Sequence, residues 1–163
     1  MHGTGTEDDG EPLPEFDLAG FLPYRLAVAA KRTSEALARQ YRDRFGITIP
    51  EWRVLVHLAH SGRVSVRDIE ARVAMERYEV SRAAGRLREA GLVDRRGNPD
   101  DRRLVVLSLT AKGRALMAEL LPLARAYQAE MERRLGPALA GLDAGLAALL
   151  EEDADWAETR RGD

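Results

Sequence analysis

The side chains whose number and spacing suggest chemistry in this sequence are arginines, which bind anionic groups. Cysteine is absent, which excludes disulfides, thiolate zinc sites and sensing by thiol oxidation. The histidines, His2, His57 and His60, are too few and too badly spaced for a typical zinc site, although His57 and His60 would share one face of a helix. No nucleophile elbow and no glycine-rich phosphate loop occur. We therefore predict a protein that is not an enzyme and that uses neither a metal nor a cofactor.

The basic residues are concentrated in one block of the chain. The formal net charge is −2, yet residues 63–114 hold 13 basic and 8 acidic residues, a local balance of +5. Such a block attracts a polyanion, and nucleic acid is the first candidate. The first nine residues are acidic and lack an apolar stretch, and no apolar run is long enough to span a bilayer. We expect a cytoplasmic protein with no membrane partner.

The elements that must position these arginines are mostly helices. Apolar residues recur at steps of three and four over six segments, residues 20–45, 50–61, 66–73, 76–90, 111–135 and 138–152. Ser65 and Thr110 are placed to cap the third and fifth of these helices, and Gly91 to end the fourth. Pro122 lies inside the fifth helix, so we expect a kink or break near Leu121.

A different pattern occupies the segment between the fourth and fifth helices. Residues 92–95 and 104–109 are strand-like, the latter rich in β-branched side chains, and residues 96–103 between them are basic and turn-rich. This pattern predicts a β-hairpin with an extended basic tip, which is a wing.

Two short helices joined by a sharp turn and followed by such a hairpin form a winged helix-turn-helix. In that arrangement the second helix enters the major groove of DNA and the first braces it. Arginine can bridge guanine acceptors, and a wing arginine can enter the minor groove. The candidate DNA contacts are Arg77, Tyr78, Ser81, Arg82 and Arg86 on the helix and Arg95, Arg96, Arg102 and Arg103 on the hairpin. The alternatives are a solvated basic helix face and a wing tip whose Asp100 and Asp101 only form salt bridges with its arginines.

Residues 21–150 resemble the MarR family, the multiple-antibiotic-resistance regulators. The segments that carry the resemblance are residues 69–82, 87–93, 98–103 and 107–113. The resemblance implies a homodimer held by the first and the last two helices, with a DNA-binding lobe on each subunit. It also implies control of nearby genes by a small ligand, commonly a phenolic or other aromatic acid. Glu70 and Ala74 depart from the small residue and the glycine that are usual in the family.

These observations together predict a mainly α fold with a small β-hairpin wing. We expect acidic tails over residues 1–17 and 153–163. Between them we expect N-terminal helices on the dimerisation and effector side over residues 18–60, a winged helix-turn-helix region over 61–110 and C-terminal dimerisation helices over 111–152.

The resemblance places the effector between the dimerisation helices and the DNA-binding lobe. The residues expected there are Tyr24, Arg25, Arg32, Trp52, Arg53 and His57, of which Tyr24, Arg25, Arg53 and His57 are the chosen candidates. An arginine beside aromatic groups suits an aromatic carboxylate, because the guanidinium binds the acid and the rings cover the apolar part. Alternatively, Trp52 belongs to the core, the arginines form surface pairs and His57 is an ordinary helix residue.

The sequence therefore predicts a dimeric regulator that binds a pseudo-palindromic operator in double-stranded DNA. We expect it to repress nearby genes and to be released by a small aromatic or acyl carboxylate. A protein-interaction module would explain the long apolar helices but not the basic wing. A constitutive architectural DNA-binding protein would explain everything except a ligand pocket.

Overall fold

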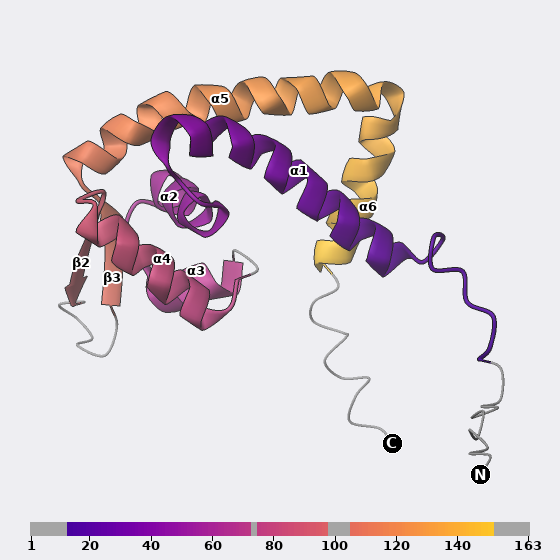
Figure 1. The fold of residues 1–163 in the computed structure, drawn as a ribbon, viewed down its shortest axis with the longest axis horizontal. Helices are drawn as coiled ribbons and strands as arrows, with labels where there is room; N and C mark the ends of the chain where they lie inside the picture. The colour runs from indigo at the N-terminus through magenta and orange to yellow at the C-terminus, as the bar shows by residue number, and fades with distance from the viewer. Residues whose placement is uncertain (1–12, 73–74, 98–104, 152–163) are drawn as a thin grey trace, which may run out of the picture. The chain divides into compact units, whose positions relative to one another are not determined.

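The computed structural model describes residues 13–72, 75–97 and 105–151, apart from the side chains of residues 70–72. Their elements follow the predicted order (Figure 1). The bounds are α1 Leu22–Phe45, α2 Ile49–Ser61, β1 Val64–Ser65, α3 Val66–Arg72, α4 Arg77–Glu89, β2 Val93–Gly97, β3 Val105–Leu109, α5 Ala111–Leu135, a 3-10 turn Gly136–Ala138 and α6 Leu139–Glu151. The fold is mainly helical with a small antiparallel sheet, as the sequence predicted.

The chain forms two compact units that divide inside α1, between residues 36 and 37. In the first unit Phe16 and Phe21 pack edge to face ahead of α1, with ring centroids 5.1 Å apart. The second unit holds the end of α1 and every later element. It contains the buried core.

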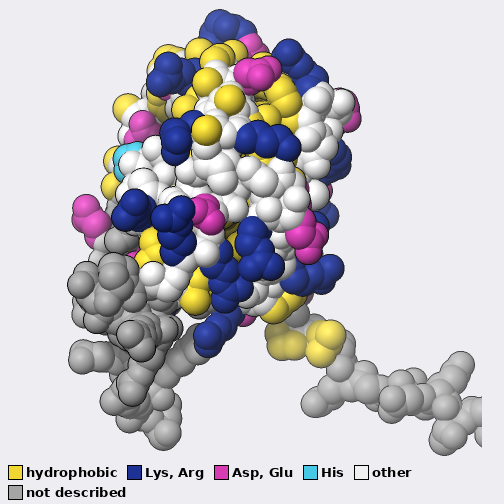
Figure 2. All heavy atoms as spheres, turned by 90° about the vertical axis from the view of Figure 1, so that its left-hand side faces the viewer, with side chains coloured by type: hydrophobic (Ala, Val, Ile, Leu, Met, Phe, Trp, Pro, Cys, Tyr) yellow, Lys and Arg dark blue, Asp and Glu magenta, His cyan; other side chains and the backbone are white. Residues whose placement is uncertain are grey.

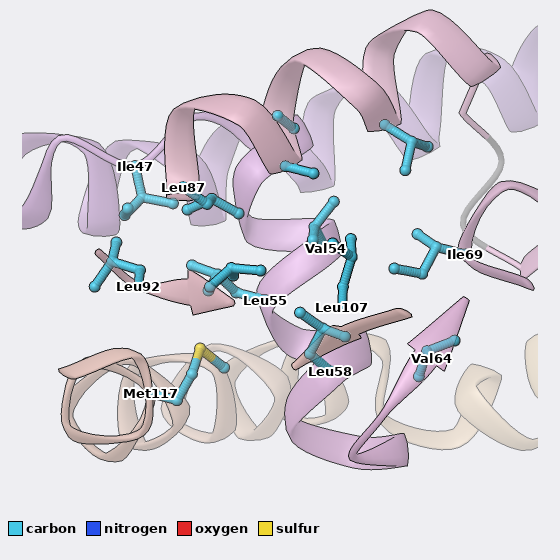
Figure 3. Packing of buried hydrophobic residues seen from close by; sticks show 14 of the residues in the cluster. Ile47, Val54, Leu55, Leu58, Val64, Ile69, Leu87, Leu92, Leu107 and Met117 are labelled. Carbon is cyan, nitrogen blue, oxygen red and sulfur yellow. The ribbon is translucent and has the colours of Figure 1, made fainter. Parts of the chain in front are cut away.

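The core of the second unit is organised around α2. This helix packs on α4, α5 and β3. Figure 3 shows Val54, Leu55 and Leu58 of α2 among side chains from the other elements, including Leu107 of β3 and Met117 of α5. All five of these side chains are at most 2% exposed. Because α2 occupies the centre of the core, the position of each surrounding element depends on it.

The sheet has three strands in the order β1-β3-β2 in the described part of the chain. The predicted hairpin is confirmed: β2 and β3 pair antiparallel from Val93 opposite Leu109 to Gly97 opposite Val105. β1 adds Val64 opposite Leu107 on the other edge of β3. β1 could not be predicted from the sequence, because two residues are too few to show an alternating pattern.

Of the kink or break expected near Leu121, the break does not occur. α5 continues as one helix from Ala111 to Leu135 through Pro122. The proline is exposed, while Leu120 is buried and Leu121 and Leu123 are half-buried. Packing of these leucines holds the helix together, although the proline lacks the amide hydrogen that would complete one backbone hydrogen bond.

Candidate nucleic-acid interface

The face that could contact nucleic acid is carried by α4, and the core decides which side of α4 this is. The buried side chains are Val80, Ala83, Ala84 and Leu87, which confirms the inward face predicted from the sequence. The opposite side exposes Arg77, Tyr78, Ser81 and Arg82. Arg95 and Arg96 of β2 are also exposed, and β2 packs against α4. We call these six residues of α4 and β2 the basic face.

The surface around the basic face is rich in positive charge. Figure 2 views the molecule from the side on which β2 and β3 lie in Figure 1, and Lys and Arg side chains outnumber acidic ones there. On β2 the guanidinium of Arg96 is held by the Asp94 carboxylate, with Nη2 and Oδ2 2.9 Å apart. A fixed guanidinium on a strand next to α4 suits a phosphate or a groove edge. Arg102 and Arg103, predicted at the wing tip, lie outside the described residues.

The first turn of α4 is fixed by an acidic residue. The backbone amide of Glu76 donates a hydrogen bond to Oε2 of Glu79 at 3.1 Å. A carboxylate at this end also interacts favourably with the helix dipole. Glu79 thus holds the end of α4 that carries Arg77 and Tyr78.

The C-terminal end of α4 is held by the segment that begins α5. Gly91 has φ +72°, the left-handed conformation that ends the helix as predicted. The Thr110 hydroxyl donates to the Gly91 carbonyl at 2.7 Å, and Lys112 Nζ donates to the Ala90 carbonyl at 2.8 Å. A Cβ at Gly113 would collide with the carbonyl oxygen of Leu92. Residues 110–113 therefore hold the start of α5 against the end of α4.

Arg86 is exposed, and its guanidinium also pairs with a carboxylate of α2. Its Nε lies 2.6 Å from Oε1 of Glu51 on α2, and Glu51 is only 6% exposed. The prediction that Arg86 contacts DNA stays a prediction, but the ion pair also gives this side chain a contact with the core helix α2. We therefore leave it out of the basic face.

Glu51 is a functional candidate that the sequence analysis missed. Its Oε2 accepts a hydrogen bond from the Thr48 amide at 2.8 Å, which caps α2. Burial alone would raise the pKa of Glu51, but hydrogen bonds from Arg86 and Thr48 outweigh it and the pKa lies below its ordinary value. The spacing Thr48-x-x-Glu51 is a capping-box signal that could have predicted the helix start. It could not have predicted the ion pair with Arg86.

The predicted effector residues fall in both units. In the first unit Tyr24 is 48% exposed and Arg25 is exposed. In the second unit Arg53 and His57 are half-buried and stand four residues apart, on one face of α2. Trp52 stacks on the buried Tyr41, with centroids 5.4 Å apart and rings inclined by 21°. Trp52 packs against the core, as the alternative interpretation held.

Within the residues that the structure describes, no cluster of three or more metal-ligating side chains occurs. In that same part of the chain, none of the helices has the length and apolar character needed to cross a membrane.

Comparison with known proteins agrees with this arrangement. Residues 45–104 match the model of the MarR family. A curated relative, the HTH-type transcriptional regulator FarR of Neisseria gonorrhoeae, is 34% identical over 89 residues, covering 53% of this chain and 61% of the relative. The chain spans about three fifths of the length of the first curated relatives that it matches.

Solved structures extend the similarity over most of the chain. BpsR of Bordetella bronchiseptica, whose DNA binding is regulated by 6-hydroxynicotinic acid, is 25% identical with a TM-score of 0.70 and covers 87% of this chain and 99% of its own. NadR in complex with 4-hydroxyphenylacetate is 26% identical with a TM-score of 0.72, and covers 86% and 99%.

The exposed helix, the hairpin beside it and these similarities define a winged helix-turn-helix fold. The chain resembles the MarR family in sequence over residues 45–104 and in fold over most of its length.

Proposed function

We propose that this protein is a homodimeric regulator of transcription that binds a pseudo-palindromic operator, represses nearby genes from the cytoplasm and is released by a small carboxylate. The observation that carries the proposal is the basic face: exposed arginines, a tyrosine and a serine on a helix that is fixed at both ends. Such a helix can enter the major groove with its side chains already oriented, which lowers the entropy cost of binding.

A dimer is supported by the apolar surface of α6. Leu142, Leu146 and Leu149 are each about 40% exposed and Leu150 is 73% exposed, at steps that place them on one side of the helix. A second copy related by a two-fold axis is the simplest way to bury such a stripe. Two DNA-binding lobes would then read half-sites about one helical turn, roughly 34–36 Å, apart.

A carboxylate effector is supported by side chains of this protein and by two relatives. BpsR and NadR are regulated by, or bind, aromatic acids. In this chain Arg53 and His57 share a face of α2, and Tyr24 and Arg25 lie on α1. A guanidinium can bind the carboxylate of an aromatic acid, and we propose that Arg53 does so.

The DNA-binding part of the proposal is tested by fluorescence anisotropy with the DNA upstream of the protein's own gene. We expect tight binding that weakens as salt is raised, because phosphate neutralisation releases counterions. Failure to bind any duplex would contradict it and would favour a protein-interaction module.

The effector part is tested by calorimetry with 4-hydroxyphenylacetate and hydroxybenzoates as probes. We expect binding that Arg53→Ala weakens and that operator DNA weakens by the same factor by which the acid weakens DNA binding. Arg125→Ala, an exposed arginine of α5, is the control. DNA binding without any response to these acids would favour the architectural alternative.

A further inference from the structure

The ion pair between the exposed Arg86 and the buried Glu51 connects α4 to the start of α2. The residues are 35 positions apart in the chain, and Arg86 Nε lies 2.6 Å from Glu51 Oε1. Both carboxylate oxygens are used, since Oε2 accepts the Thr48 amide. Hydrogen bonds between charged groups are short and directional, and an arginine fork loses little freedom in forming them. The pair therefore constrains orientation as well as distance.

Because Arg86 lies on α4, its ion pair also limits how the basic face can be oriented. Arg82 and Arg86 are four residues apart, so their side chains leave the helix in nearly the same direction. Both side chains are exposed, but only that of Arg86 is paired with Glu51 on α2. A rotation of α4 about its axis would move both, and the ion pair with Glu51 resists that rotation.

We propose that Glu51 and Arg86 are positioning residues for DNA recognition, holding α4 at the rotation that lets Arg77, Ser81 and Arg82 reach base edges. The inference rests on the proposed DNA-binding function. The pair acts between helices: Glu51 belongs to the central helix of the core, and Arg86 belongs to the helix that carries the basic face. The pair contributes to specificity without touching DNA.

A direct contact between Arg86 and a phosphate makes the opposite prediction. In that case Glu51 would compete with DNA for the guanidinium, and Glu51→Gln would strengthen binding. Arg86→Gln would also reduce the salt dependence by about one counterion. A positioning role requires that both substitutions weaken specific binding and leave the salt slope unchanged.

The experiment measures anisotropy titrations at several salt concentrations with two probes. One is a duplex that the wild-type protein selects from a random pool, and the other is poly(dI-dC). The variants are Arg86→Gln, Arg86→Lys, Glu51→Gln and the double variant Glu51→Gln/Arg86→Gln, with melting of each followed by circular dichroism. Glu51→Gln keeps the volume of the side chain and an oxygen that can cap α2, so it is the variant least expected to unfold.

We expect each single glutamine variant to lose about tenfold in affinity for the selected duplex, and the double variant to lose no more, because the two residues act as one unit. Affinity for poly(dI-dC) should change little, and Arg86→Lys should recover part of the loss. Tighter binding by Glu51→Gln, or equal losses on both probes in step with melting, would overturn the inference. A wild-type protein that binds neither probe would overturn the proposed function itself.

Discussion

At the scale of single residues, the arginines of α4 differ in what surrounds them. Arg77, Arg82 and Arg86 are all exposed, but Arg86 differs in pairing with the buried carboxylate of Glu51. A residue that reads a base loses its effect when the site is scrambled, and a residue that positions the helix changes how every base is read. The two roles are therefore separable by measurement.

Arg82→Ala is expected to weaken binding to the specific operator by about 1–3 kcal/mol, because it would remove the bidentate contact to a base that we propose for Arg82. Binding to unrelated DNA should fall much less. Anisotropy with both duplexes measures the difference, and Arg125→Ala, which removes an exposed arginine of α5, is the matched control. Equal losses on both duplexes would show that Arg82 contacts only phosphate.

Acid should weaken the fold through Glu51. Its pKa in the folded protein is lowered, so its stabilising contribution is present above the unfolded pKa and is lost as the pH falls through the folded pKa. The free energy of unfolding of the wild type should exceed that of Glu51→Gln at pH 7, and this gap should narrow as the pH falls below about 4, near the usual pKa of a glutamate. Urea unfolding of both proteins across this range measures it. A difference in unfolding free energy that does not change with pH would contradict the lowered pKa of Glu51.

At the scale of elements, the junction between α4 and α5 determines how the C-terminal end of α4 is held. Thr110, Lys112 and Gly113 all act on the turn that ends α4. Lys112 places a positive charge at the negative end of the α4 dipole, which is favourable. A helix proposed to form part of the dimer is thus joined directly to the helix proposed to enter DNA.

Gly113→Ala should destabilise the protein by about 1–3 kcal/mol, because the added methyl group must displace the Leu92 backbone. Gly85→Ala in α4 is the matched control. No heavy atom lies within 4 Å of its added Cβ, and alanine favours a helix over glycine by about 1 kcal/mol. Thermal or urea unfolding should therefore show opposite signs for the two variants. An unchanged free energy of unfolding in Gly113→Ala would mean that the Leu92 backbone can shift at little cost.

At the scale of the whole molecule, the exposed leucines of α6 form the surface through which we propose that two copies associate. Leu146→Glu should place a charge in the proposed interface and shift the protein from dimer to monomer in sedimentation experiments. Ala144→Glu, on the opposite side of α6, is the control and should leave the dimer intact. The monomer should also lose most of its operator affinity, since two linked half-sites bind far more tightly than one. A wild-type monomer at micromolar concentration would remove the basis for this arrangement.

The sequence by itself determined several features that depend on neighbouring residues. The cap at Thr110, the end of α4 at Gly91 and the buried side of α4 follow from short-range spacing, and all three are confirmed. The hairpin was equally predictable, because β-branched residues flank a turn-rich segment. The similarity to the MarR family also rests on motifs that are contiguous in the chain.

Tertiary structure decided the features that depend on distant residues. The partner of Arg86 is 35 positions away, β1 exists only because Val64 meets Leu107, and Gly113 is needed only because Leu92 lies against it. From the sequence alone Pro122 predicts a helix break, and only the structure shows that the leucines beside it are packed. Local spacing gives the direction of a side chain along its own helix. It does not identify the group that the side chain contacts, because that group comes from another part of the folded chain.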